Sequence, residues 1–338
     1  MSSSKTPRRF RRALGVLVVF VAVCAVIVGA GVWRYRAPGP LPAQVAIVIP
    51  HGGYASTIRA LQDQSALPVG WLDTQLFRLA IIATRHDGQL HAAELEFPAA
   101  ASMEQILQVL RHGLPVRHWL TIPEGLTARQ IAALVNGAPF LLGTVPVPVE
   151  GDTAPQTYDY PRGVERSALV GRMRAAMRRD VAEVWAARAP ELPLKTPEEL
   201  VTLASIVEKE TGVPDERPHI ARIFLNRLRL GMKLQSDPTT IYAINDGAGP
   251  LRRPLTHADM AFPSPYNTYV SSGLPPGPIC SPGLASLQAV AHPASGDDLY
   301  FVASGKGGHR FAASLEEHNR NIAILRGNTA EMRATPQP

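Results

Sequence analysis

Residues 196–212 read TPEELVTLASIVEKETG and contain the clearest helix start in the sequence. Thr196 suits the N-cap, Pro197 the first helical position, and Glu199 the third position of a capping box. Gly212 is a natural C-terminal stop. We therefore predict a well-capped helix over this stretch, and we interpret the rest of the chain outward from it.

The predicted helix has one apolar stripe, because its apolar residues recur at the spacing of a single helix face. The stripe consists of Leu200, Leu203, Ala204 and Val207. Glu208 and Glu210 lie on opposite flanks of it, roughly 160° apart at about 100° per residue. Acids that face opposite sides cannot flank one glycosidic bond, which excludes the paired carboxylates of an ordinary glycosidase. A carboxyl at the edge of a buried face, beside the small side chains of Ala204 and Ser205, can be partly desolvated and donate a proton near neutral pH. On spacing alone, a solvated helix acid is the more ordinary interpretation.

The surrounding sequence mixes helical and strand-like segments, so we expect an α+β chain. Strands are predicted at 45–50, 91–97, 119–125 and 299–304, and helices at 72–83, 102–112, 127–136, 164–189, 219–230, 282–291 and 314–326. After Gln235 the chain is rich in Pro, Gly, Tyr and Asn, a composition typical of loops that carry function.

The N-terminal region carries the features of a membrane anchor. Residues 13–33 read ALGVLVVFVAVCAVIVGAGVW, a charge-free run of 21 residues. As a helix it is about 31 Å long, the thickness of a bilayer's hydrocarbon core. Five basic residues precede it, which predicts a cytoplasmic N-terminus and the rest of the chain on the far side. A cleaved signal peptide is the alternative, although its apolar core is normally shorter.

Charge and motif content exclude several functions. Seven of the 34 basic residues and none of the 28 acids lie in residues 1–36, which leaves 27 basic residues against 28 acids elsewhere. This balance argues against nucleic-acid binding. The two cysteines, Cys24 and Cys280, form no disulfide framework or paired metal motif, and no His-Glu-x-x-His occurs. We expect no metal and no cofactor. We interpret His292, His309 and His318 as structural or surface residues and SGKGGH (304–309) as a turn.

Three longer blocks resemble the endolytic murein transglycosylase (MltG, YceG-like) family. They are SIVEKETGVPDERPHIARIFLNRLRLGMKLQSDPTTIYAI (205–244), PYNTYVSSGLPPGPICSPGLASLQAVAHPA (265–294) and LYFVASGKGGHRFAASLEEHN (299–319). The segment VEGDTAPQTYDY (149–160) is similar to a further family segment, but Gln156 replaces its acid. The resemblance implies a lytic transglycosylase that cleaves the β-1,4 bond between N-acetylmuramic acid and N-acetylglucosamine and leaves a 1,6-anhydro end.

The family's single catalytic acid falls within EKET, and we assign it to Glu208, first as general acid and then as base. The polar and aromatic residues expected to contact saccharide are Gln235, Asp237, Tyr242, Tyr266, Asn267 and Thr268. Two alternatives stay open. One is a membrane-tethered protein that only binds peptidoglycan, and the other is a water-using muramidase with Asp237 as its second acid.

The predicted organisation follows from the anchor and the resemblance. It consists of a cytoplasmic basic tail (1–12), a transmembrane helix (13–33), a linker (34–44), a small LysM-like α+β module (45–120), a connecting region (121–195), a mixed α+β catalytic domain (196–330) and a tail (331–338). The expected location is the bacterial inner membrane, with a single pass and a periplasmic catalytic domain. The expected partners are peptidoglycan glycan strands, the cytoplasmic membrane and, by the resemblance, peptidoglycan synthases.

Overall fold

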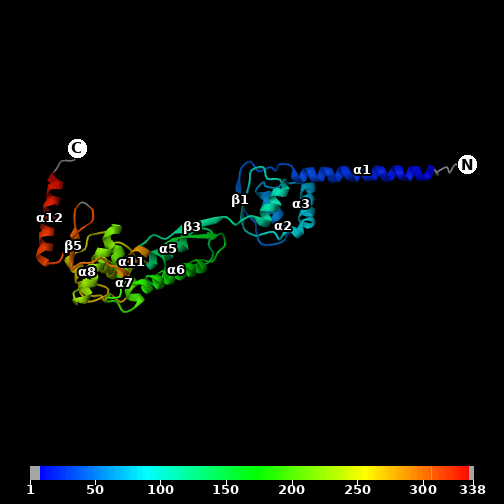
Figure 1. Ribbon diagram of the computed structural model, residues 1–338. Coiled ribbons are helices and arrows are strands. Elements are labelled where there is room, and N and C mark those ends of the chain that lie inside the picture. Colours follow the sequence, from blue (N-terminus) through cyan, green and yellow to red (C-terminus); the bar gives the residue numbers. More distant parts are fainter. Residues whose placement is uncertain (1–7, 306, 335–338) are drawn as a thin grey trace. The chain divides into compact units, whose positions relative to one another are not determined.

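The computed structural model describes residues 8–305 and 307–334. Its contacts divide the chain into two compact units on either side of the His118–Trp119 bond. Helices and strands are mixed in both units (Figure 1), which confirms the predicted α+β class.

The first unit begins with one long helix and continues as a small α+β module. Its elements are α1 (Arg8–Arg36), β1 (Val45–Val48), α2 (Tyr54–Asp63), α3 (Trp71–Ala83), the 3-10 turn η1 (Arg85–Asp87), β2 (Glu94–Phe97) and α4 (Met103–His112). β1 and β2 pair antiparallel, with Val45 opposite Phe97. The strand–helix–helix–strand order of β1 to β2 is the order on which the LysM-like prediction rests, and the module's identity stays a prediction.

The module has its own core, in which Phe77, Leu95 and Leu107 are fully buried. α4 starts as its sequence predicts, because Ser102 and Gln105 form a reciprocal capping box. The module therefore has the core and the capped helix expected of an independently packed unit.

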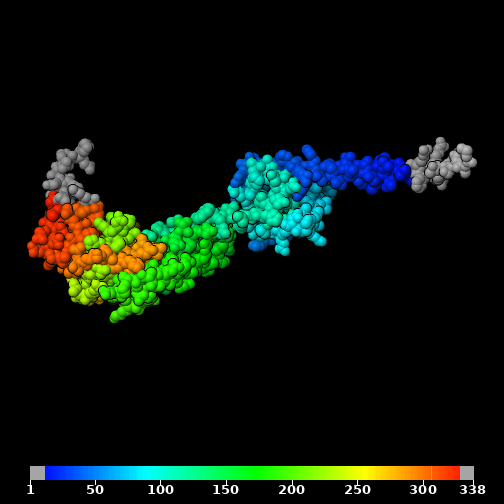
Figure 2. All heavy atoms as spheres, viewed as in Figure 1, coloured from blue at the N-terminus to red at the C-terminus, as the bar shows by residue number. Residues whose placement is uncertain are grey.

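Within α1, residues Arg12–Arg36 form a helix long and apolar enough to cross a membrane. Its apolar side chains stand free of the rest of the described chain over most of its length (Figure 2). Length and composition are thus consistent with a single-pass anchor.

The second unit contains most of the helices and two small sheets. Its elements are β3 (Arg117–Thr121, which begins just before the division), α5 (Ala128–Gly137), β4 (Thr157–Pro161), α6 (Arg166–Ala187), α7 (Pro197–Glu210), the 3-10 turn η2 (Pro214–Glu216), α8 (Arg217–Arg229), α9 (Asp237–Asn245), α10 (His257–Met260), α11 (Leu284–Ala291), β5 (Tyr300–Ala303), β6 (His309–Ala312) and α12 (Leu315–Ala334). β3 pairs with β4, and β5 pairs antiparallel with β6.

α7 is the central helix of this unit and packs against α6, α8 and α11. Leu200, Leu203 and Val207 of the predicted stripe are fully buried. Thr196 accepts the N–H of Glu199 as expected for an N-cap, but the Glu199 carboxylate accepts the N–H of Lys195. The capping box is therefore only half formed.

Residues 121–195, predicted as a connecting region, pack within the same unit as residues 196–330, and α6 lies against α7 and α11. The predicted domain bounds stay a prediction. One feature of this unit differs from the sequence-based expectation. The loop after Gln235 contains two short helices, α9 and α10, which local Pro and Gly content obscures in the sequence.

Candidate active site

The end of α7 directs its two acids to different places, as its helical geometry predicts. Glu208 points to the start of α11, and Glu210 points to the residue that precedes α9. The two carboxylates therefore lie in separate environments, which can be compared as candidates for a general acid.

Both oxygens of the Glu208 carboxylate make contacts within the protein. Its Oε2 accepts the Gly283 N–H at 3.0 Å and the Ser286 hydroxyl at 2.7 Å, and its Oε1 lies 3.5 Å from Nη2 of Arg217. The side chain is 6% exposed. Glu208 thus connects α7 to the first turn of α11 and to α8. Its negative charge also interacts favourably with the dipole of α11 at the N-terminus of that helix.

Glu124 extends this cluster from the loop between β3 and α5. Its Oε2 lies 3.7 Å from Nη2 of Arg217. Burial, and then the nearby charge of Glu208, raises the pKa of Glu124, while Arg217 lowers it. Nothing in the local sequence distinguishes Glu124 from other surface acids. It shares its cation with Glu208 and reinforces the same junction between elements.

The Glu210 side chain lies in the wall of a polar and aromatic cavity of about 400 Å³. The cavity is lined by Glu210, Arg227, Gln235, Asp237, Tyr269, Tyr300, Phe301, Val302, Ala303, His309, Leu315 and His318. Aromatic rings with polar tips suit a ligand that has both apolar and hydroxylated faces. Gln235 and Asp237, both predicted from the sequence, therefore share a cavity with Glu210.

The surroundings of Glu210 favour its protonated form. Burial raises the pKa of its carboxyl to about 7, and the negative charge of Asp237 adds to this rise. The Ser236 hydroxyl, which donates to Oε1 of Glu210, and the cation of Arg227 act in the opposite direction. A carboxyl with this pKa is present in both protonation states near pH 7, as a group that both donates and accepts a proton requires.

Two neighbours of Glu210 are themselves held in place. Arg227 is buried in the cavity wall, where Nε donates to the Leu299 carbonyl at 2.7 Å and Nη1 to the Leu234 carbonyl at 2.6 Å. The Tyr269 hydroxyl donates to Oδ1 of Asp237 at 2.6 Å. The cavity thus presents a fixed cation and a fixed carboxylate beside Glu210.

Asn267 and Thr268 position the loop that carries these groups. Both are fully buried. Oγ1 of Thr268 accepts the Ser236 N–H at 3.0 Å and lies 2.8 Å from Oγ1 of Thr239, while Asn267 donates to the carbonyls of Met260 and Phe262. Their burial does not fit the saccharide contact predicted for them. Both residues instead support the turn that leads into α9.

Tyr242 and Tyr266 lie in a different part of the unit. Their rings are 4.9 Å apart, and the Tyr242 hydroxyl donates to Oε2 of Glu150 at 3.2 Å. Tyr242 lines a second cavity, between α5 and α9, and neither tyrosine lines the Glu210 cavity. Of the six predicted saccharide contacts, Gln235 and Asp237 are therefore the two that line the Glu210 cavity.

His309 and His318, expected to be structural or surface residues, line the Glu210 cavity. Nδ1 of His309 lies 2.7 Å from Oε2 of Glu216, which fixes the ring. His318 stacks on Tyr300, and its buried Nδ1 has no hydrogen-bond partner among the described residues. Burial, and then the charge of Arg227, lowers the pKa of His318, so its ring is neutral near pH 7. Only the folding of β5, β6 and α12 brings these histidines to Glu210.

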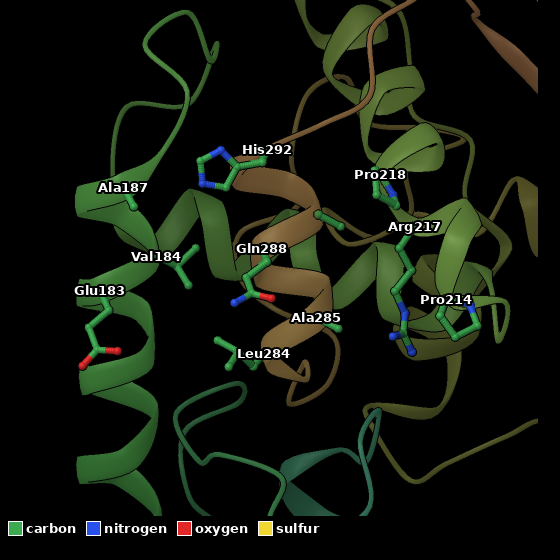
Figure 3. Close-up of a pocket in the computed structure, with 11 residues that line it drawn as sticks. Glu183, Val184, Ala187, Pro214, Arg217, Pro218, Leu284, Ala285, Gln288 and His292 are labelled. Atoms are coloured by element: carbon green, nitrogen blue, oxygen red, sulfur yellow. The ribbon is translucent and has the colours of Figure 1, made fainter.

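A larger cavity of about 550 Å³ lies between α6, α8 and α11 (Figure 3). Its walls are mainly apolar, and Glu183, which is exposed, is the only carboxylate that lines it. Arg217 borders this cavity, but Glu208 does not line it. Within residues 8–305 and 307–334, no cluster of three His, Cys, Asp or Glu side chains is arranged to hold a metal ion. The Glu210 cavity is therefore the better candidate for acid–base chemistry.

Comparison with known proteins agrees with the resemblance seen in the sequence. The chain is 31% identical over 284 residues to the endolytic murein transglycosylase of Streptococcus pneumoniae serotype 2, an alignment that covers 69% of this chain and 50% of that protein. It is 43% identical over 121 residues to the endolytic murein transglycosylase of Bacillus subtilis, which covers 36% of this chain and 32% of that protein. The chain thus spans half or less of the length of these relatives.

A solved structure extends the similarity to the fold. The crystal structure of a yceG-like protein from Listeria monocytogenes superimposes with a TM-score of 0.53 at 29% identity, covering 82% of this chain and 98% of that one. The family model described as the YceG-like family matches residues 47–324. This match includes the module from residue 47 onward, α7 and the Glu210 cavity, and the chain belongs to the YceG-like family.

Proposed function

We propose that this chain is a membrane-anchored endolytic lytic transglycosylase that cleaves the β-1,4 bond between N-acetylmuramic acid and N-acetylglucosamine in glycan strands. The single observation that carries this proposal is the Glu210 carboxyl, which lies in a polar, aromatic cavity with its pKa raised to about 7. The names of the relatives supply the substrate class, and the cavity supplies an acid suited to the reaction.

Glu210 acts twice in the proposed mechanism. Its protonated carboxyl first donates a proton to the glycosidic oxygen, and the bond to the anomeric carbon breaks. The acetamido group of the N-acetylmuramic acid residue stabilises that carbon, as in substrate-assisted glycosidases. The Glu210 carboxylate then accepts the proton of the 6-hydroxyl as its oxygen closes on the anomeric carbon. The proton count is restored, a 1,6-anhydro ring forms, and no water is consumed.

This assignment moves the catalytic role along α7 from the residue predicted by the sequence. Assignment to Glu208 stays a prediction, but its two carboxylate oxygens face Gly283, Ser286 and Arg217, and it lines neither the Glu210 cavity nor the cavity in Figure 3. Glu210 meets the geometric requirement of a general acid better, because its carboxyl borders a space that a sugar can enter.

The other cavity residues have supporting roles in the proposal. Asp237 carries a negative charge that stabilises the positive charge developing at the anomeric carbon. Tyr300 and His318, which stack on each other in the cavity wall, form an aromatic surface for a sugar ring. The LysM-like module binds glycan weakly in this scheme and takes no part in the chemistry.

A water-using muramidase is a second candidate, because Asp237 lies in the same cavity as Glu210. In that mechanism a second carboxylate would activate water or attack the anomeric carbon. A protein that only binds peptidoglycan is the non-enzymatic alternative.

Product analysis separates the three possibilities. Purified glycan strands are incubated with the chain, and the new ends are identified by mass spectrometry before and after borohydride reduction. Anhydro ends, which resist reduction, support the proposal. Reducible ends would establish the muramidase, and intact strands would leave only binding.

We also propose the arrangement in the membrane. α1 crosses the bacterial inner membrane once, with its basic start in the cytoplasm and residues 37–338 in the periplasm, where glycan strands lie. Association with peptidoglycan synthases remains part of this proposal on the strength of the family resemblance.

A further inference from the structure

α3 exposes an apolar face that does not contribute to the core of the module. Phe77 and Ile81, on one side of the helix, are buried in the module core. Leu72 and Leu79 lie on the opposite side of the helix and are 74% and 63% exposed. Trp71 and Ile82 flank them and are 73% and 48% exposed, and Val69, just before the helix, is 84% exposed. So large an exposed apolar surface on one helix calls for a partner.

The position of α3 against α1 identifies that partner. Nε of Arg34 lies 2.8 Å from Oδ1 of Asp73, and a methyl group added at Gly31 would lie 3.8 Å from Cδ1 of Leu76. Gly31 is still within the charge-free run that ends at Trp33. α3 therefore contacts α1 at the level where the apolar span ends, and Figure 1 shows it running across that end of α1.

The charges on α3 are compatible with a lipid surface. Asp73, its one acidic residue, is paired with Arg34, and Arg78 is exposed beside the apolar face. A helix with tryptophan and leucine on one face and a basic residue at its edge is typical of helices that lie in the membrane interface. Tryptophan in particular favours the head-group level of a bilayer.

We infer that the exposed face of α3 (Val69, Trp71, Leu72, Leu79 and Ile82) lies in the lipid interface of the outer leaflet of the membrane that α1 spans. This inference rests on the proposed anchor, because a bilayer that surrounds residues 13–33 must also reach the helix packed at their end. The contact fixes the orientation of the module on the membrane surface, so the module is not free to turn about a flexible stalk.

The test uses the full-length chain in lipid nanodiscs and a polarity-sensitive fluorophore attached to single cysteines. Leu79→Cys reports the α3 face, in a chain that also carries Cys24→Ser, while Cys280 is buried and is retained. Leu114→Cys is the matched control, because Leu114 is also an exposed leucine, at 86%. It follows the C-terminal end of α4, whereas the residue of α4 that pairs with Arg36 of α1 is Glu104, at the N-terminal end. The unmodified Cys24, labelled in the native sequence, reports whether α1 is inside the bilayer.

The inference predicts blue-shifted emission at residue 79, with stronger quenching by lipids that carry a nitroxide near the head group than by lipids that carry it deep in the acyl chain. The label at residue 114 should show neither effect. Aqueous emission at residue 79 with deep quenching at residue 24 would overturn the inference and leave the anchor intact. Loss of quenching at both positions would overturn the anchor as well. Blue-shifted emission at residue 79 without lipid quenching would mean that protein covers α3, which also overturns the assignment to lipid.

Discussion

Two substitutions beside Glu210 should move the pH dependence of cleavage in opposite directions. Ser236→Ala removes a hydroxyl that donates to the ionised Glu210 carboxylate, and this hydroxyl is not used to cap α9. A hydrogen bond to a charged group stabilises the charged form by roughly 1.5–3 kcal/mol, and a water molecule in the cavity recovers part of this when the hydroxyl is removed. Because about 1.4 kcal/mol corresponds to one pKa unit, the pKa of Glu210 should rise by about one unit. The basic limb of kcat/KM should therefore move from about pH 7 to higher pH.

Asp237→Asn should have the opposite effect. It removes the negative charge that raises the pKa of Glu210 and keeps an oxygen that can accept the Tyr269 hydroxyl. In a solvent-accessible cavity this charge is partly screened, so we expect the basic limb to move to lower pH by about one unit or less.

The assay is the initial rate of release of anhydro-ended fragments from pH 5 to pH 9 at low substrate concentration. Ser286→Ala is the matched control, because it removes the equivalent hydroxyl from Glu208. It should leave the basic limb unmoved. A shift with Ser286→Ala and none with Ser236→Ala or Asp237→Asn would refute the reasoning and return the catalytic role to Glu208.

Three further predictions concern stability and the anchor. Leu203→Ala, at a fully buried position in α7, should lower the free energy of unfolding by about 2–5 kcal/mol in urea titrations, and a loss well under 1 kcal/mol would contradict the packing described. The pKa of Glu210 in the folded protein is about 7, above the usual value of 4.5, so between these pH values the folded state binds a proton that the unfolded state does not. The stabilisation that comes from this proton is lost as pH rises towards and through 7. Glu210→Gln should therefore become more stable relative to wild type between pH 4.5 and 8, by up to roughly 3 kcal/mol, whereas a pH-independent difference would argue against a raised pKa. Deleting residues 1–36 should move the protein from the membrane to the soluble fraction, and continued membrane retention would show that another part of the chain suffices.

Much of the local structure could be predicted because its determinants are local. Ser102 and Thr196 are N-caps whose partners lie three residues away, and both helices start where expected. The periodicity of α7 also predicted that Glu208 and Glu210 face opposite sides, which their contacts confirm. The apolar run after Ala13 similarly predicted the long helix α1.

The active-site assignment required information that local sequence does not contain. Glu208 and Glu210 are nearly equivalent by spacing, and they differ only in what α8, α9, α11 and the last hairpin place around them. Ser286 reaches Glu208 from 78 residues away, and His318 reaches the Glu210 cavity from still further along the chain. Asn267 and Thr268 are polar residues in a loop, a setting that predicts saccharide contact, but their side chains are buried and their polar atoms hold the backbone around them.

The role of Glu210 as general acid is tested most directly by two variants, Glu210→Gln and Glu208→Gln. The yield of 1,6-anhydro ends from purified glycan strands is measured for each, with circular dichroism to confirm that both variants fold. Glu210→Gln keeps the size of the side chain and an oxygen to accept the Ser236 hydroxyl but cannot transfer a proton, so the rate should fall by at least about 10²–10⁴-fold. Glu208→Gln should mainly weaken the junction of α7 with α11 and retain cleavage by the folded protein. Near wild-type yield from folded Glu210→Gln, with loss of cleavage by folded Glu208→Gln, would contradict the account.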